Sequence, residues 1–172
     1  MIVLHKKSEF NSQKMTEQQK IFMKMAIELS QKGMDLGKGG PFGCIIVRNG
    51  EVIGKGSNSV SSTNDPTAHA EVMAIRDACK NLNNFQLEDC DIYTSCEPCP
   101  MCLGAIYWAR PARVFYANSK KDAAKAGFDD QFIYDELDLP YHQRKIPFKQ
   151  ILADEAKIVF ENWLKKENKT LY

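Results

Sequence analysis

The segment SCEPCPMC, residues 95–102, carries three cysteines at intervals of three residues. It follows residues 91–94, which are predicted to form a short buried strand, and it leads into the pattern of a helix that begins at Cys99. Cys99 and Cys102 are three residues apart in the first turn of that helix, so both thiolates can bind one ion. Cys96 precedes the turn, and we expect it to pack at the strand end.

The cysteine spacing separates three kinds of metal site. An iron–sulfur cluster would need a fourth cysteine after three further residues, where the chain has Ile106. A structural zinc site commonly uses two separate C-x-x-C pairs, and the sequence has no second pair elsewhere. Three protein ligands and one open position fit better, and that arrangement is typical of catalytic zinc.

We expect His69 to be the third ligand, because it lies at the start of another helix in the stretch TAHAE, residues 67–71. The positive ends of two helices that meet at one point favour thiolates. His69 and Glu71 would diverge by about 200° inside a helix, so the site should lie beyond the helix end. Either residue alone would indicate an ordinary polar side chain. H-x-E followed by P-C-x-x-C, however, is the signature of zinc-dependent nucleobase deaminases.

These residue types fit a hydrolytic deamination. Zinc lowers the pKa of a bound water from about 9 towards about 7, which provides hydroxide near neutral pH. Glu71 should act as the proton shuttle and not as a ligand. It takes a proton from the zinc-activated water and gives one to a ring nitrogen beside the amino-bearing carbon, after which ammonia is released.

The composition narrows the class of protein. A chain of 172 residues with 44% hydrophobic and 26% charged residues is typical of one soluble globular domain. A net charge of +1 argues against a surface that holds many phosphates, so no nucleic-acid partner is expected. No apolar run is long enough for a membrane span or an export signal, which predicts a cytoplasmic protein without a membrane partner. Cys44 and Cys79 have apolar neighbours and are predicted in the core.

The order of the expected elements predicts an α/β fold with a mixed sheet covered by helices on both faces. Thr16 and Gln19 form a capping box that opens the first helix, with an apolar stripe at positions 22, 25, 29 and 36. Asn49-Gly50 predicts a type I′ hairpin turn. Residues 1–15 are expected to form a flexible leader. The predicted strands cover 42–47, 51–55, 91–94, 113–117 and 148–152, and the later helices 66–82, 99–109, 128–137 and 154–166.

Several segments of the chain resemble the cytidine deaminase-like zinc superfamily and, within it, the small microbial guanine deaminases. The resemblance implies a three-layer α/β/α fold with a mixed sheet of about five strands. It also implies one zinc ion per subunit and hydrolysis of guanine to xanthine and ammonia in purine catabolism. The segments are GGPFG (39–43), NDPTAHAEV (64–72), CEPCPMCLGAIYWARP (96–111) and AGFDDQFIY (126–134).

By the same resemblance, five residues would bind the purine base. Asn58 would bind its ring-carbonyl side, and Asp130 would accept hydrogen bonds from its amino and imide groups. Phe42 and Trp108 would wall the pocket, and the amide of Ala70 would donate to the base. The chemistry of a carboxylate permits the role of Asp130, because it can accept two hydrogen bonds from an edge that bears two donors.

Two of these residues also have a purely structural interpretation. Asp129 and Asp130 precede a predicted helix, and either could merely cap it. Asn58 is a common turn residue. The sequence leaves both interpretations open.

The resemblance also predicts a homodimer in which the C-terminal segments are domain-swapped. The deaminase domain would cover 16–172, and its end would cross to the other subunit. There Tyr172 would close the partner's pocket as a lid. On composition alone, a terminal tyrosine would be a frayed tail residue.

Three other functions remain open at this level. A guanosine or other nucleoside deaminase would read the same base edge and would need only more room beside it. A tRNA adenosine deaminase would need a basic groove and an extruded nucleotide, which the near-neutral charge balance disfavours. A zinc-stabilised interaction module without catalysis would leave Glu71 as a dispensable surface charge.

Overall fold

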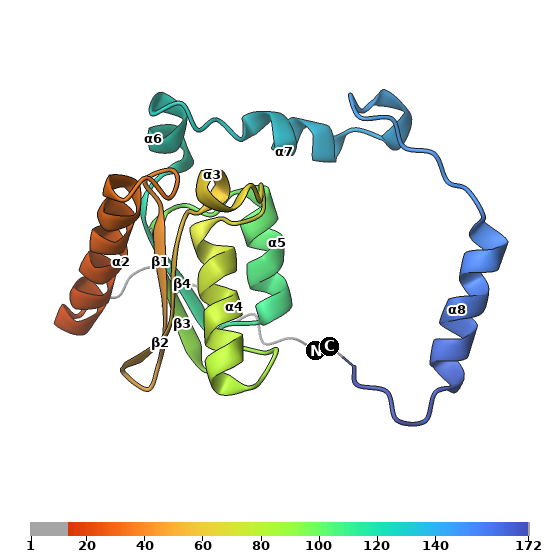
Figure 1. The fold of residues 1–172 in the computed structure, drawn as a ribbon, viewed down its shortest axis with the longest axis horizontal. Coiled ribbons are helices and arrows are strands. Elements are labelled where there is room, and N and C mark those ends of the chain that lie inside the picture. Colours follow the sequence, from red (N-terminus) through yellow and green to blue (C-terminus); the bar gives the residue numbers. More distant parts are fainter. Residues whose placement is uncertain (1–13, 172) are drawn as a thin grey trace.

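The computed structural model describes residues 14–171. The predicted leader therefore lies almost wholly outside the described residues, and so does Tyr172. Within 14–171 the central sheet has four strands, in the order β2-β1-β3-β4. β1 pairs antiparallel with β2 and β3, whereas β3 and β4 are parallel, so the sheet is mixed as predicted (Figure 1). The strands are β1 (Gly43–Arg48), β2 (Glu51–Ser57), β3 (Cys90–Cys96) and β4 (Arg113–Asn118).

Helices cover both faces of this sheet and confirm the three-layer α/β/α arrangement. Helix α2 (Glu17–Asp35) lies on one face, and helices α4 (Ala70–Leu82) and α5 (Pro100–Ala109) lie on the other (Figure 1). Strand β1 contributes to both layers of core, because successive side chains of a strand point to opposite faces. Its side chains on one face join Phe22, Ala26 and Tyr93, and those on the other join Ala70, Ala74, Ala78, Ile92 and Ile106.

The first helix and the hairpin form as the sequence predicts, with one correction. Thr16 and Gln19 make both hydrogen bonds of the capping box, and Asn49 and Gly50 both have positive φ, at 53° and 81°. The predicted apolar stripe of α2 is wrong at its end, because Leu36 is exposed. The buried face consists of Phe22, Ala26, Ser30 and Gly33.

Small residues face the sheet because α2 packs directly against the backbone of β1. A Cβ atom at Gly43 would collide with the carbonyl oxygen of Ala26 and the amide nitrogen of Ser30. Gly43 is therefore required by this close approach and not by an unusual backbone angle.

The start of α4 also differs from the prediction. We expected a helix from Pro66, but α4 begins at Ala70. The side-chain oxygen Oδ1 of Asp65 accepts hydrogen bonds from the amide and the hydroxyl of Thr67, at 2.8 and 2.6 Å. This Asx turn competes with helix formation in the residues that precede Ala70.

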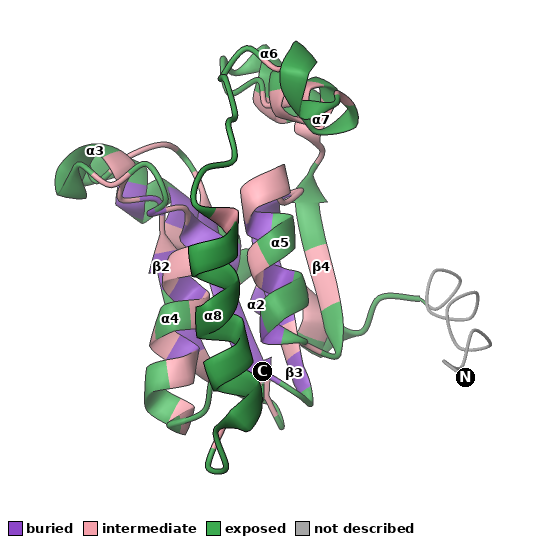
Figure 2. Cartoon of the chain, turned by 90° about the vertical axis from the view of Figure 1, so that its right-hand side faces the viewer, coloured by how far each residue is buried: buried purple, intermediate pink, exposed green. Residues whose placement is uncertain are grey.

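The last third of the chain extends away from the sheet. It contains α6 (Lys120–Lys125), α7 (Gln131–Asp138), the 3₁₀ turn η2 (Tyr141–Gln143) and α8 (Ala153–Lys165), and a short α3 (Val60–Thr63) precedes α4. Helices α6 and α7 lie across the end of the sheet at which α4 and α5 begin, whereas α8 stands clear of the domain (Figure 1). Almost the whole length of α8 is exposed (Figure 2).

The predicted strand at 148–152 is wrong for this structure. These residues are irregular, and no strand of the described chain lies beside them to provide backbone partners. The sheet therefore has four strands where about five were predicted.

Two smaller predictions concern membranes and the core. No helix within residues 14–171 combines the length and the apolar character that a membrane span requires. The cytoplasmic location stays a prediction. Cys44 is fully buried as predicted, while Cys79 is half-buried against the same core cluster.

Candidate active site

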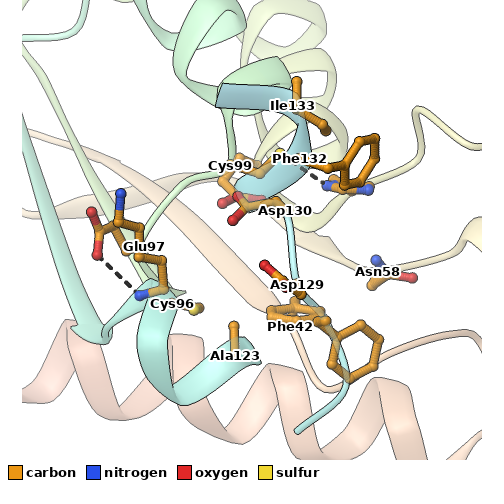
Figure 3. Close-up of a pocket in the computed structure, with 14 residues that line it drawn as sticks. Phe42, Asn58, Cys96, Glu97, Cys99, Ala123, Asp129, Asp130, Phe132 and Ile133 are labelled. Atoms are coloured by element: carbon orange, nitrogen blue, oxygen red, sulfur yellow. Dashed lines mark hydrogen bonds between the residues drawn. The ribbon is translucent and has the colours of Figure 1, made fainter. Parts of the chain in front are cut away.

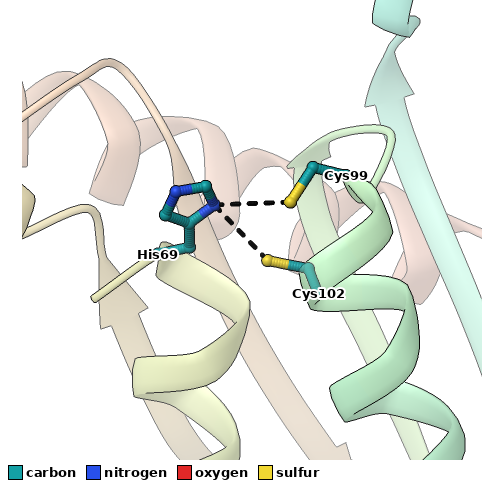
Figure 4. A group of neighbouring side chains, drawn as sticks. All are labelled: His69, Cys99 and Cys102. Atoms are coloured by element: carbon teal, nitrogen blue, oxygen red, sulfur yellow. Dashed lines mark hydrogen bonds between the residues drawn. The ribbon is translucent and has the colours of Figure 1, made fainter. Parts of the chain in front are cut away.

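The three predicted metal ligands lie together at the point where α4 and α5 begin. Their ligand atoms all lie within 4.8 Å of one another. Nδ1 of His69 is 3.5 Å from Sγ of Cys99 and 3.6 Å from Sγ of Cys102 (Figure 4). Cys96 is not a member of this group, which agrees with its predicted place at the end of β3.

The geometry of the group fits zinc. In a tetrahedral site with Zn–S near 2.3 Å and Zn–N near 2.0–2.1 Å, the nitrogen and sulfur ligand atoms are about 3.6 Å apart. The two nitrogen–sulfur separations match that spacing without any rearrangement. Two cysteines and one histidine are also a known ligand set of catalytic zinc sites with one open position.

Two of these ligands occupy the same position at the start of a helix. His69 is the N-cap of α4 and Cys99 is the N-cap of α5, and both have extended backbones, with ψ of 156° and 169°. Pro100 fits the first position of α5, because its fixed φ is helical and that position needs no amide donor. Both helix N-termini therefore point their positive ends towards the ligands and stabilise thiolate charge.

The hydrogen bonds among the ligands shift their pKa values. The thiol of Cys102 and then the ring of His69 lower the pKa of Cys99 to about 4. The hydrogen bond between Cys102 and Cys99 raises the pKa of Cys102. The hydrogen bond between His69 and Cys99 raises the pKa of His69. Cys99 is therefore the ligand that most readily carries the thiolate charge.

Glu71 lies in the first turn of α4, directly beside the ligands, and is only 6% exposed. Its Oε2 accepts a hydrogen bond from Sγ of Cys102 at 3.4 Å. Burial raises the pKa of this carboxyl above its ordinary value. A carboxyl whose pKa moves towards neutrality can both accept and return a proton, which is what general acid–base catalysis requires.

A cavity of about 250 Å³ opens onto the metal ligands. Its size suits one small ring system better than a drug-sized ligand. The cavity combines aromatic walls with a few convergent polar groups (Figure 3). Its lining includes Phe42, Asn58, His69, Glu71, Cys96, Glu97, Cys99, Lys120, Phe128, Asp129, Asp130, Phe132 and Ile133.

Asn58 follows the last residue of β2 and is nearly buried. Its Oδ1 accepts hydrogen bonds from the amides of Gly40 and Val60, both at 3.2 Å. The bond to Val60 is the local turn that the structural interpretation foresaw. Because the oxygen is bound to the backbone, the Nδ2 donors of Asn58 are the part of the amide that is left for a ligand in the cavity.

The two consecutive aspartates at the end of the GFDD segment have different roles. Oδ1 of Asp129 accepts a hydrogen bond from the amide of Gln131 at 2.9 Å, so Asp129 fixes the turn into α7. Asp130 is the N-cap of α7 but makes no side-chain bond to the helix, and its carboxylate lies near Cys99 (Figure 3). Burial, and then the charge of Cys99, raise the pKa of Asp130. The helix-capping interpretation therefore holds for Asp129 and not for Asp130.

The remaining predicted residues have different outcomes. Ala70 is the buried first residue of α4, and its amide belongs to the first helical turn, where backbone donors lack intrahelical partners. Trp108 is not among the residues that line the cavity of its own chain, so its role as a wall of the substrate pocket stays a prediction. It is 64% exposed, beside a groove between α4 and α5 with Val72, Ile75 and Phe85. The position is about 9 Å along α5 from Cys102.

Phe128 and the residues around it complete the cavity but were not predicted. The ring of Phe128 packs edge-on against Phe42, with centroids 4.9 Å apart. Residues 119–127 show no apolar periodicity, so no apolar pattern indicates helix α6, which leads to this wall. The adjoining GFDD motif was the one available pointer to Phe128.

The fold and this site define a class of zinc-dependent deaminases, and comparison with known proteins agrees. Residues 16–118 match the family described as the cytidine and deoxycytidylate deaminase zinc-binding region, and the chain belongs to this family. It is 57% identical to the guanine deaminase of Bacillus subtilis (strain 168) over 151 residues, which are 88% of this chain and 97% of that protein.

Two further comparisons bear on the fold and the substrate. The crystal structure of guanine deaminase from Bacillus subtilis has a TM-score of 0.88 and 55% identity, covering 92% of this chain and 99% of that one. The tRNA-specific adenosine deaminase of Aquifex aeolicus (strain VF5) is 36% identical over 146 residues, which are 84% of this chain and 93% of that protein.

Proposed function

We propose that this chain is a zinc-dependent guanine deaminase that converts guanine and water to xanthine and ammonia in purine catabolism. The observation that carries the proposal is one cavity lined by the metal ligands His69 and Cys99 together with Glu71, Asn58 and Asp130. The third ligand, Cys102, lies against His69 and Cys99. The similarity to the guanine deaminase of Bacillus subtilis, at 57% identity, supports guanine as the substrate.

The residues of the chain divide the chemistry among them. His69, Cys99 and Cys102 would hold zinc, which when bound supplies the Lewis acidity that makes water a nucleophile near neutral pH. Glu71 accepts the proton that the attacking water loses. It then returns a proton to the ring nitrogen next to the amino-bearing carbon. A carbon–oxygen bond forms, the carbon–nitrogen bond breaks, and the amino group leaves as ammonia.

Recognition of the base depends on two polar side chains and an aromatic wall. The carboxylate of Asp130 accepts hydrogen bonds from the imide and amino groups of guanine, a two-donor edge that suits a two-oxygen acceptor. Nδ2 of Asn58 donates to the ring-carbonyl side, and the amide of Ala70 also donates to the base. Phe42 covers a face of the ring.

A substrate panel tests the proposal. Ammonia release is measured from guanine, guanosine, cytosine and adenosine, using protein whose zinc content has been determined. We expect turnover of guanine above that of the other three. A zinc-loaded protein that releases no ammonia from guanine would refute the proposal, and faster release from guanosine would make the chain a nucleoside deaminase.

Replacement of Glu71 separates an enzyme from a zinc-stabilised interaction module. We expect Glu71→Gln to retain zinc and to lose guanine turnover by roughly 10²-fold or more, the usual scale for a missing general acid or base. Zinc content and steady-state rate are measured on the same preparation. An unchanged rate would show that Glu71 carries no proton in the reaction.

A tRNA adenosine deaminase is the second candidate, because the relative from Aquifex aeolicus is 36% identical over most of both chains. The net charge of +1 gives the whole molecule little attraction for a polyanion. A filter-binding titration with tRNA at several salt concentrations distinguishes the two. Tight, strongly salt-dependent binding together with adenosine deamination would support the tRNA function.

We further propose that residues 16–172 act as one deaminase domain within a domain-swapped homodimer, and that the leader 1–15 is flexible. The C-terminal segment would pack on the partner subunit, and Tyr172 would close the partner's pocket. Two observations support the exchange: α8 exposes large apolar side chains, and the groove beside Trp108 exposes others. Exposed apolar surface of this kind is typical of an interface.

A further inference from the structure

Glu97 connects the metal-ligand loop to the wall of the substrate pocket. It lies two residues before Cys99, and its side chain lines the cavity. Its carboxylate oxygen Oε2 accepts a hydrogen bond from the amide of Lys120 at 3.0 Å (Figure 3). Its own amide donates to the carbonyl of Asn118, the last residue of β4, at 2.8 Å. Glu97 therefore forms hydrogen bonds with the chain on both sides of Ser119, the N-cap of α6.

Helix α6 needs such a contact, because it cannot be stable by itself. It has six residues, none of them buried, and isolated helices shorter than about 12 residues are marginal in water. Ser119 and Asp122 form a capping box, which supports the first turn but does not attach it to the core. The amide of Lys120 is one of the first-turn donors that the capping box leaves without a partner, and Glu97 supplies the acceptor for it.

The position of α6 determines the position of Asp130. After α6 the backbone turns at Gly127, with φ of +90°, and Phe128 and Asp130 follow within three residues. The amide of Phe128 donates back to the carbonyl of Ala123 in α6 at 3.0 Å, so this wall is attached to the helix. Towards the domain, the ring of Phe128 packs edge-on against the ring of Phe42.

We propose that Glu97 is a positioning residue for substrate recognition: its carboxylate fixes the first turn of α6, and thereby places Asp130 at the correct distance from the metal ligands. This inference rests on the proposed role of Asp130 in binding guanine. It assigns Glu97 no contact with the reacting atoms. Because Asp130 holds the base in the ground state and the transition state alike, loss of its position should raise KM more than it lowers kcat.

The first test replaces Glu97 itself. Glu97→Ala removes the acceptor, and we expect KM for guanine to rise about 10-fold while kcat falls no more than about 3-fold, the loss expected for one hydrogen bond that orients a binding group. Glu97→Gln keeps an acceptor oxygen of similar reach and should restore KM to within about 3-fold of the wild-type value. Zinc content should be unchanged in both variants. Loss of zinc in Glu97→Ala would assign Glu97 to the metal loop and overturn the proposal.

The second test removes the other partner and does not depend on Glu97 variants folding. Lys120→Pro deletes only the amide donor and the side chain, because proline is well tolerated at the first helical position. Ser119, the residue before it, is already extended with ψ of 163°, as a residue before proline requires. Lys120→Ala loses the same side chain and keeps the amide. We expect Lys120→Pro, and not Lys120→Ala, to reproduce the KM increase; equal KM values in the two variants would overturn the proposal.

Hydrogen exchange separates this proposal from the proposed function. In Glu97→Ala, amides in residues 120–130 should exchange faster than in the wild type, while amides in α4 should not. This comparison needs no turnover. If the wild type fails to deaminate guanine, the proposed function fails, yet faster exchange would still show that Glu97 holds α6. Unchanged exchange together with an unchanged KM would refute the role of Glu97.

Discussion

At the scale of single residues, neighbouring residues of the same type have different roles in this protein because the backbone places their side chains differently. Asp129 bonds to the amide of Gln131, while Asp130 directs its carboxylate into the cavity. Cys96 is the last residue of β3, whereas Cys99 is the N-cap of α5. The side chain of Cys96 donates to the carbonyl of Ser119, whereas Cys99 faces His69. Residue type alone would not have assigned these roles.

The cysteines give the first prediction. Cys96 lies outside the group of ligand atoms formed by His69, Cys99 and Cys102, and its thiol donates to the carbonyl of Ser119. Cys96→Ser should therefore retain about one zinc per subunit, while Cys99→Ser and Cys102→Ser should lose most of it, because zinc needs each thiolate. Elemental analysis after dialysis measures the metal. Release of zinc from Cys96→Ser as readily as from Cys99→Ser would contradict the ligand assignment.

Gly39 gives a second prediction at this scale. A Cβ atom there would overlap Oδ1 of Asn58, so Gly39→Ala should displace the side-chain amide that we propose donates to the substrate. We expect KM for guanine to rise about 10-fold, the scale of one misplaced hydrogen-bonding group. Gly37→Ala is the matched control, because nothing lies within 4 Å of its added methyl group, although its positive φ of 65° adds some strain. A KM that is equal in the two variants would show that Asn58 tolerates the displacement.

At the scale of elements, local sequence signals succeeded where they act within a few residues. The capping box at Thr16, the Asn49-Gly50 turn and the apolar strands β1 and β3 all follow from short-range rules and were confirmed. The zinc ligands could also be predicted, because the two motifs name them. The chemistry of the ligands limits which residue types can occupy those positions.

The failures at this scale have physical causes that lie outside the local pattern. Helix α4 begins later than predicted because the side chain of Asp65 accepts hydrogen bonds from Thr67. This Asx turn competes with the helix, and helix propensity does not account for it. Helix α6 has no apolar face to detect, since it is attached through Glu97 and the cap at Ser119. The strand at 148–152 has the right residues but lacks a neighbouring strand in the described chain.

The capping box of α2 gives the prediction that belongs to this scale. Thr16→Ala removes the oxygen that accepts from the amide of Gln19 and should lower the free energy of unfolding by about 1 kcal/mol. Thr16→Ser keeps that oxygen and should stay within about 0.5 kcal/mol of the wild type. Denaturant unfolding followed by circular dichroism measures both. Because the cap is far from the cavity, KM for guanine should not change in either variant.

At the scale of the whole molecule, the chain leaves its last helix without a core to bury it. Helix α8 exposes Ile158, Phe160 and Leu164, at 54%, 72% and 70%. A soluble monomer rarely presents so many large apolar side chains on one helix, and such a surface marks an interaction site. The groove between α4 and α5, with Trp108 beside it, is a second exposed apolar surface. Two copies of the chain would cover both surfaces at once.

The final prediction tests this assembly. The wild type should be a dimer by light scattering coupled to gel filtration. Phe160→Glu should shift it towards the monomer, because burying a charge in an apolar interface without a partner is costly. Glu161→Gln changes the neighbouring exposed position and should leave the dimer intact. If Tyr172 closes the partner's pocket, the monomeric variant should also lose guanine turnover while it keeps its zinc. A dimeric Phe160→Glu, or a monomer with full activity, would show that the C-terminal segment does not complete the site of another subunit.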